Sequence, residues 1–273
     1  MKIVKASGDV VPFDKNAIKK SIVRAGASSE LAKEVSNEVR KKVSDGMNTK
    51  DILKLTLKSL KKNPKIATRY DLKRAIMKLG PTGFPFEEFF SQVLKSYGYK
   101  TRVGVQVMGK VVSQEVDIIA IKKLTSMVEA KYHNAPGIKT DKKVAMYTYA
   151  RYLDIKSNPK NHFDNAWLVT NTKCTSQAIK YSKGVGIKMV GWSYPSKGNL
   201  QELIEKRGLY PITIFKNMPN KVKEKLFEIK IVLAKDLVNR SLGDLVKKTG
   251  LNKKVLSKVL DEAKNYVSGN NKI

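Results

Sequence analysis

Two consecutive apolar segments, residues 116–120 and 127–131, each carry a carboxylate, Asp117 in the first and Glu129 in the second. Short apolar segments of this kind predict strands, and alternate residues of a strand project to one face, so Glu129 and Lys131 should point together. The connection between the segments is short enough for a hairpin, which would pair the strands and bring Asp117 near Glu129. The chain is therefore expected to fold into a sheet that gathers two carboxylates and a lysine.

These three side chains have the chemistry of a phosphodiester hydrolase. A carboxylate among apolar residues is costly unless it is paired or bound to a metal. Asp117 and Glu129 offer hard oxygen ligands to Mg²⁺ or Mn²⁺, and Lys131 could orient or deprotonate a water. Glu-x-Lys taken alone is more often an ordinary cross-strand ion pair at a sheet edge. The upstream Asp117 and the basic composition of the chain favour a metal-dependent catalytic site.

The charge of the chain predicts a polyanionic partner. Its 273 residues include 54 Lys and Arg against 24 Asp and Glu, which gives a formal net charge of +30. The excess is present in each of the segments 1–80, 81–215 and 216–273. A thermophilic surface normally adds acidic residues alongside lysine. The imbalance therefore favours contact with nucleic acid.

Composition excludes several other classes of protein. A hydrophobic content of 41% supports folded cores rather than a disordered basic tail. No apolar run approaches the ~20 residues that a membrane span needs, so no membrane association is expected. The single cysteine, Cys174, excludes an internal disulfide framework and a Cys-cluster zinc site. The first residues lack the apolar region of a signal peptide, and a cytoplasmic protein is expected.

Changes in sequence rhythm predict three domains, at residues 1–80, 83–211 and 216–273. The first begins with two extended segments around a turn and continues as helices, the last of them a single helix over residues 66–79. The second alternates helices and strands, which indicates an α/β fold with a central sheet flanked by helices. The third is small, helical and rich in lysine.

The second domain resembles the Mrr-like branch of the PD-(D/E)xK nuclease superfamily. The resemblance rests on Asp117, Glu129-x-Lys131, a helix from Phe86-Glu87 to Gly98-Tyr99, the segment 167–172 with the helix after it, and Val190-Gly191-Trp192. It covers about residues 83–211 and implies a restriction-endonuclease-like mixed sheet flanked by helices. It also implies that Glu87 contributes to the metal site, with Glu88 as the neighbouring alternative. One departure is Val116, where this branch commonly has a proline.

Two residues near this pattern are candidate DNA contacts. His133 follows the Glu-x-Lys strand and could approach a phosphate or the metal site. A strand-end histidine with a structural hydrogen bond is an equally good interpretation. Arg151 shares a helix face with Tyr147 at a spacing of four residues. The resemblance implies that helices near such sites contact the DNA backbone, so Arg151 is a candidate phosphate contact.

The N-terminal domain resembles the ATP-cone, an adenine-nucleotide module of ribonucleotide reductases and related proteins. The residues that carry the resemblance are Ile3, Val4, Lys5, Gly8, Phe13, Asp14, Ile18, Ile22, Arg69, Tyr70 and Arg74. The resemblance implies binding of ATP or dATP, with lysines pairing with the phosphates. The nucleotide-binding residues predicted in this way are Ile3, Lys5, Phe13, Asp14 and Lys19. The usual cone pattern is replaced at Ala6-Ser7 and at Ala17, so the alternative is a degenerate cone retained for folding, dimerisation or DNA contact.

The third domain contains a sequence of the helix-hairpin-helix type. A turn at Gly250-Leu251 separates two predicted helices, 241–249 and 252–267, and its backbone N–H groups could bind a DNA phosphate. The lysines predicted to supply the counter-charge are Lys253, Lys254 and Lys258. The alternative is a helical dimerisation arm with a solvated lysine face.

These patterns together predict a Mg²⁺-dependent (or Mn²⁺-dependent) DNA endonuclease regulated by adenine nucleotide. Glu87, Asp117 and Glu129 would hold the metal, and Lys131 would assist the attacking water. Cleavage of two strands usually requires two active sites, so a homodimer is expected. The alternative is a nucleotide-responsive DNA-binding regulator with a silent nuclease fold, against which the complete Asp…Glu-x-Lys set argues.

Overall fold

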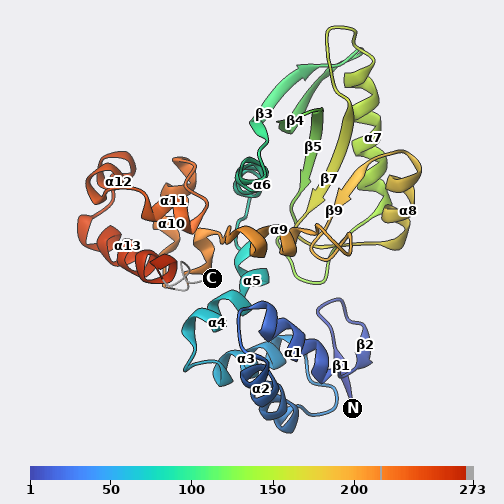
Figure 1. Cartoon of the computed structure of the whole chain (residues 1–273). Helices are drawn as coiled ribbons and strands as arrows, with labels where there is room; N and C mark the ends of the chain where they lie inside the picture. Colours follow the sequence, from blue (N-terminus) through green and yellow to red (C-terminus); the bar gives the residue numbers. More distant parts are fainter. Residues whose placement is uncertain (216, 269–273) are drawn as a thin grey trace. The chain divides into compact units, whose positions relative to one another are not determined.

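The computed structural model describes residues 1–215 and 217–268 (Figure 1). The chain divides into two compact units. The first consists of residues 1–75 together with 135–137, and the second consists of residues 76–134 and the chain from residue 138 onward. The segment 135–137 therefore belongs to a different unit from the residues on either side of it.

The first unit is an antiparallel hairpin followed by helices. The Asp14 carboxylate begins the first helix by accepting a hydrogen bond from the Asn16 backbone N–H at 2.8 Å. Ile18, Ile22 and Val35 contribute to its apolar core, together with residues of the later helices. The elements are β1 (Lys2–Val4), β2 (Val10–Pro12), α1 (Lys15–Arg24), α2 (Ser29–Lys42), α3 (Thr49–Ser59), α4 (Pro64–Tyr70) and α5 (Leu72–Ile76).

The prediction of a single helix over residues 66–79 is wrong. The structure has two short helices, α4 and α5, which are separated at Asp71. Asp71 is buried and forms an ion pair with the Arg74 Nε at 3.1 Å. Pro64 begins α4 rather than ending a helix, which suits a residue that lacks a backbone N–H. Hydrophobic periodicity alone does not distinguish one bent helix from two.

The second unit is built on a five-stranded mixed sheet with strand order β3-β4-β5-β7-β9. The first three strands are antiparallel, and β7 and β9 continue the sheet in parallel with β5. The strands are β3 (Lys100–Met108), β4 (Ser113–Ile121), β5 (Thr125–Lys131), β7 (Asn165–Thr170) and β9 (Lys188–Val190), and a separate parallel pair is formed by β6 (Lys139–Thr140) and β8 (Lys173–Cys174). The predicted α/β class with a mixed sheet is confirmed.

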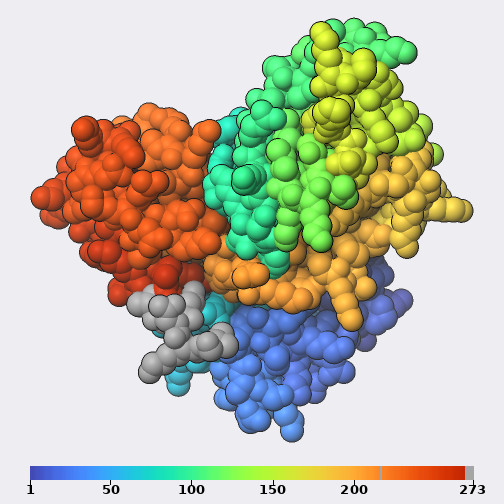
Figure 2. Space-filling model, turned by 45° about the horizontal axis from the view of Figure 1, so that its top comes forward, coloured from blue at the N-terminus to red at the C-terminus, as the bar shows by residue number. Residues whose placement is uncertain are grey.

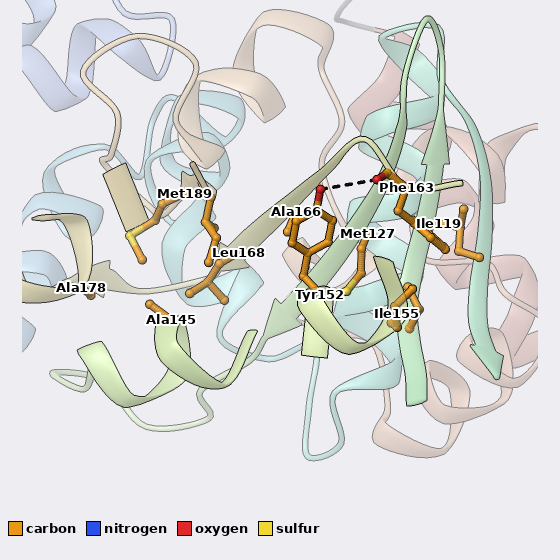
Figure 3. Close-up of a cluster of buried hydrophobic side chains, with 12 residues drawn as sticks. Ile119, Met127, Ala145, Tyr152, Ile155, Phe163, Ala166, Leu168, Ala178 and Met189 are labelled. Carbon is orange, nitrogen blue, oxygen red and sulfur yellow. Dashed lines mark hydrogen bonds between the residues drawn. The ribbon is translucent and has the colours of Figure 1, made fainter. Parts of the chain in front are cut away.

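Helices flank this sheet. Helix α6 (Phe84–Ser96) packs against β3, β4 and β5 through buried phenylalanines, and α7 (Lys142–Lys156) packs against β5, β7 and α8 (Ser176–Gly184). Figure 3 shows the apolar cluster beneath α7, where Tyr152 and Ile155 of the helix meet Met127 and Leu168 of the sheet. The Tyr152 hydroxyl donates to the Phe163 carbonyl oxygen at 3.4 Å. This core fixes the face of α7 that is turned toward β5.

The C-terminal part of the second unit is helical, as predicted. Its elements are α9 (Leu200–Arg207), the short 3₁₀ helix η1 (Ile212–Ile214), α10 (Asn220–Glu228), α11 (Ala234–Val238), α12 (Leu242–Thr249) and α13 (Lys253–Ser268). Gly250 ends α12 in the left-handed conformation, with a φ of 66°, which glycine adopts without steric cost. The helices α10 to α13 lie in the orange-to-red part of the surface in Figure 2. Among the residues that the structure describes, no helix combines the length and the apolar character that crossing a bilayer requires.

Candidate functional site

The two predicted carboxylates lie on neighbouring antiparallel strands. Strand β4 carries Asp117, and β5 carries Glu129 and Lys131. The pairs Ile118–Val128 and Ile119–Met127 set the register, and continuing it by one residue places Asp117 opposite Glu129. The Asp117 Oδ2 accepts a hydrogen bond from the backbone N–H of residue 130 at 2.7 Å. The predicted proximity of Asp117 and Glu129 is therefore confirmed.

The backbone beside Asp117 is irregular. The pairing of β3 with β4 extends on both sides of Gly104 but omits the pair of Gly104 and Asp117. Gly104 has a φ of 63°, a conformation that side-chain-bearing residues rarely adopt. Irregularities of this kind change the direction of a neighbouring side chain. The glycine therefore contributes to the placement of the carboxylate.

Glu87 lies close enough to this pair to share its electrostatics. It stands in the first turn of α6 and is half-buried. The pKa of Glu87 is raised to about 7, first by burial and then by neighbouring carboxylates, of which Asp117 has the largest effect. The adjacent Glu88 is buried, and its Oε1 accepts a hydrogen bond from the Gln92 side chain at 2.8 Å. Of the two alternatives on this helix, Glu87 is the one whose charge acts together with Asp117 and Glu129.

Arg151 of α7 forms an ion pair with Glu129. Its Nη1 lies 2.5 Å from the Glu129 Oε2, and the two side chains are only 10% and 12% exposed. The Arg151 Nε is also buried, and no described residue accepts a hydrogen bond from it. The guanidinium lies 5.1 Å from the centre of the Tyr147 ring. This position does not agree with the predicted contact between Arg151 and the DNA backbone, because the core beneath α7 turns the arginine inward.

The cluster retains protons to unusually high pH. The pKa of Glu129 is raised to about 7, first by burial and then by the charge of Asp117, although Arg151 and Lys131 oppose the shift. Burial also raises the pKa of Asp117. A carboxylate that is paired with an arginine ordinarily has a lowered pKa. The raised value shows that desolvation and carboxylate repulsion outweigh the ion pair here.

Stability is expected to fall with increasing pH because of these groups. Between about 4.5, the ordinary value, and about 7, the folded protein keeps a proton on Glu87 that the unfolded chain has lost. The free energy of unfolding therefore decreases as the pH rises through this range. In EDTA, the melting temperature of Glu87→Gln should fall less between pH 5 and pH 8 than that of the wild type. The exposed Glu34→Gln is the control, and an equal fall in all three proteins would contradict the expectation.

The carboxylates do not form the predicted three-ligand metal site in this arrangement. Within residues 1–215 and 217–268, no three His, Cys, Asp or Glu side chains are grouped closely enough to hold a metal ion. One oxygen of Glu129 is bonded to Arg151, and one of Asp117 to a backbone N–H. Carboxylate oxygens are nevertheless suitable donors for Mg²⁺, and a divalent cation would relieve the repulsion that raises their pKa values. The donor chemistry fits a metal, and the ion pair with Arg151 engages one of the two carboxylate oxygens of Glu129.

His133 forms structural hydrogen bonds at the end of β5, as its alternative interpretation predicted. Its Nε2 lies 3.0 Å from the Thr140 Oγ1, and its backbone N–H donates to the Asn171 Oδ1 at 2.9 Å. The pKa of His133 is lowered by burial and by the charge of Lys131. The buried Thr140, Thr170 and Asn171 complete this hydrogen-bonded group. The sequence shows these small polar residues at the ends of strands, but it does not show which of them form hydrogen bonds with one another.

The N-terminal unit contains a cavity beside four of the five predicted nucleotide-binding residues. The cavity has a volume of about 430 Å³. Its lining includes Ile3, Lys5, Phe13 and Asp14, and the residues that were not predicted include Thr49, Ile52 and Tyr70. Lys19 instead lines a second, more open cavity along α1, of about 820 Å³, together with Asp14, Lys20 and Arg24. The first cavity is thus mainly apolar, with cations at its edge and on the adjoining helix.

The C-terminal lysines lie where the sequence placed them. Lys253, Lys254 and Lys258 are exposed in the first half of α13, directly after the Gly250 turn. Ser241 begins the preceding helix by accepting from the Asp244 backbone N–H at 3.1 Å. The arrangement is two helices joined by a tight turn, with cations at the start of the second.

Comparison with known proteins identifies both ends of the chain. Residues 1–79 match the family model of the ATP cone domain, and residues 210–267 match the model described as AF1548-like, C-terminal. An uncharacterized protein of Archaeoglobus fulgidus is 39% identical over 178 residues, which are 65% of this chain and 99% of that protein. The chain belongs to the AF1548-like family. The ATP-cone domain predicted at the N-terminus is confirmed.

A solved structure of this family resembles the chain in fold as well. The crystal structure of the protein of unknown function AF1548 has 37% sequence identity with this chain and a TM-score of 0.63. The match covers 69% of this chain and 100% of that one. The family relationship therefore supports the fold.

Proposed function

We propose that the protein is a Mg²⁺-dependent DNA endonuclease whose activity responds to ATP or dATP. The observation that carries the proposal is the juxtaposition of Asp117, Glu129 and Lys131 on two paired strands. Glu87 lies close enough to Asp117 and Glu129 for their charges to raise the pKa of Glu87. Buried carboxylates with raised pKa values are costly, and proteins keep them where function requires them. A mixed sheet flanked by helices, with acidic residues on its central strands, is also the arrangement implied by the resemblance to PD-(D/E)xK nucleases.

The site residues have separate tasks in this proposal. Asp117 and Glu129, with Glu87 at their edge, would hold the divalent cation, which lowers the pKa of a water and offsets charge on the phosphate. Lys131, which lies beside these carboxylates in the same half-buried environment, would orient the attacking water and stabilise the negative charge of the transition state. Arg151 would hold Glu129 in place through one of its two carboxylate oxygens.

DNA as the substrate is supported by charge. The net charge of +30 favours a polyanion, and Lys253, Lys254 and Lys258 present three exposed cations beside a tight helical turn. These lysines would contact the DNA backbone rather than bases. A homodimer would supply two sites for the two strands. The direct test is nicking of supercoiled plasmid in Mg²⁺ or Mn²⁺, with EDTA as the metal-free reaction, and an absence of nicking with every metal would contradict the proposal.

The ATP-cone domain supports nucleotide binding in the cavity of the first unit. Ile3, Phe13 and Tyr70 would contact the base, and Lys5 would pair with phosphate. We expect Lys5→Ala and Phe13→Ala each to weaken ATP binding by about tenfold, the loss of one charged or apolar contact. Isothermal titration calorimetry measures this directly. Lys2→Ala is the matched control, because Lys2 is in β1, three residues before Lys5, but does not line the cavity. Equal weakening in all three variants would contradict the assignment.

A second candidate function is a nucleotide-responsive DNA-binding regulator without nuclease activity. It is favoured by the ion pair between Glu129 and Arg151, which occupies one of the two oxygens that Glu129 offers to a metal. Gel-shift experiments with and without ATP or dATP distinguish the two candidates. DNA binding that changes with nucleotide, with no cutting under any metal, would favour the regulator.

A further inference from the structure

We infer that nucleotide bound in the cone acts on the candidate site through residues 132–138, the segment that directly follows Lys131. The inference rests on the proposed function, because it describes the regulation of that same site. The segment starts at the end of β5, contributes residues 135–137 to the first unit, and returns to the second unit before β6. Its covalent continuity with β5 makes it a direct connection from the cone to Lys131.

The middle of the segment is packed against the hairpin of the cone. Gly137 has a φ of 90°, and a Cβ added to it would lie 2.3 Å from the carbonyl oxygen of Ala6 and 2.9 Å from the backbone nitrogen of Ser7. Ala6 directly follows Lys5, which lines the cavity. A ligand that contacts Lys5 therefore acts on the peptide unit against which Gly137 is packed.

The two ends of the segment are held firmly in the second unit. At the first end, the Asn171 side chain donates to the His133 carbonyl oxygen at 2.8 Å and accepts from the His133 N–H at 2.9 Å. At the other end, the Thr140 hydroxyl contacts the His133 ring at 3.0 Å and donates to the Thr170 Oγ1 at 2.8 Å. Asn171 and Thr140 are completely buried. Because both ends are held in this way, a displacement of Gly137 should be passed to His133, which lies two residues from Lys131.

Tyr132, the residue after Lys131, is also hydrogen-bonded near residues 75–76, where the chain first passes from the first unit to the second. Its hydroxyl donates to the Met77 carbonyl oxygen at 2.7 Å and accepts from the Gly80 N–H at 2.9 Å. Met77 lies just beyond the boundary at residues 75–76. The Tyr132 ring packs 5.7 Å from that of Phe86, the residue before Glu87. Tyr132, next to Lys131, therefore belongs to one connection between the units and is hydrogen-bonded to the other. Through Phe86 it also contacts the residue that precedes Glu87.

Hydrogen exchange of the intact protein tests this coupling without a nuclease assay. Saturating ATP, and separately dATP, should slow amide exchange in residues 131–140 of the wild type by about fivefold or more, a typical size for coupling between two sites. Calorimetry establishes binding in the same samples. If a nucleotide binds and exchange in 131–140 does not change, the coupling is wrong while the proposed nucleotide binding stands. If neither nucleotide binds, the nucleotide part of the proposed function is wrong and the coupling falls with it.

Gly137→Ala separates binding from transmission. The new methyl group meets the Ala6 backbone and should displace the segment, so nucleotide affinity is retained while the protection of residues 131–140 is lost. Gly46→Ala is the matched control: Gly46 also has a positive φ, of 77°, but no described atom lies within 4 Å of the added Cβ. Full protection in Gly137→Ala would overturn the proposed route, as would its loss in both variants. The wild-type measurement stands by itself should Gly137→Ala fail to fold.

Discussion

Lys131→Ala should reduce the nicking of supercoiled plasmid in Mg²⁺ by on the order of a thousandfold, the usual loss when a group that stabilises transition-state charge is removed. Asp117→Asn should have an effect of similar size, because it keeps the shape of the side chain while removing the charge that would hold the metal. Initial rates of conversion from supercoiled to open-circular plasmid measure both effects. The two substitutions act on different steps, so only Asp117→Asn should also weaken the binding of Mn²⁺ measured by calorimetry.

The control for this experiment is Lys123→Ala. Lys123 is an exposed lysine in the connection between β4 and β5, so its removal changes the net charge by the same amount near the same strands. Its nicking rate should stay close to that of the wild type. If Lys131→Ala and Asp117→Asn also cut at the wild-type rate while DNA binding is intact, these residues are not the catalytic site.

Arg151→Met should destabilise the protein by about 3–5 kcal/mol at pH 8, because Glu129, which is ionised and paired in the wild type, must then either stay charged without its partner or take up a proton. Urea denaturation in EDTA measures the loss. At pH 5, below the pKa of about 7 for Glu129, the carboxyl group is protonated in the folded state, so the loss should be much smaller. This dependence on pH distinguishes an uncompensated charge from a simple packing defect.

A double variant and an exposed ion pair provide the controls. Glu129→Gln combined with Arg151→Met removes both charges, and most of the stability should return. Lys225→Met removes one partner of the largely solvent-accessible pair between Lys225 and Glu228, and should change stability by no more than about 1 kcal/mol. If the double variant is as unstable at pH 8 as Arg151→Met alone, the ion pair does not explain the loss.

The central part of the candidate site was predictable because it is local. Asp117 and Glu129 are joined by a short hairpin, and the length of its loop restricts the register of the two strands. The same short-range logic placed the hairpin of the cone, whereas the cavity residues Ile3, Lys5 and Phe13 came from the resemblance to the ATP-cone. It also predicted the two helices around Gly250. In each case the deciding interactions lie within about one supersecondary unit of the chain.

Arg151 shows where this logic stops. Its distance from Glu129 in the sequence is 22 residues, and helical spacing from Tyr147 suggested an outward face. A signal was nevertheless present, because Thr148, Arg151, Tyr152 and Ile155 follow the spacing of one buried helix face. Reading the arginine as part of that stripe would have predicted a buried cation in need of a carboxylate. The sequence could not say which carboxylate, because this depends on how α7 crosses the sheet.

The sequence by itself determined most of the elements, the mixed α/β character and the pairing of Asp117 with Glu129, since periodicity and short connections specify these. It also carried the resemblance to the ATP-cone, through motif residues of the first 80 positions. Only the tertiary structure decided that Arg151 holds Glu129 and that residues 135–137 belong to the unit of the cone. Both arise from contacts between segments far apart in the chain. Such contacts are selected by the burial of whole faces, as in the cluster between α7 and the sheet, and a short stretch of sequence does not specify the partner of a buried residue.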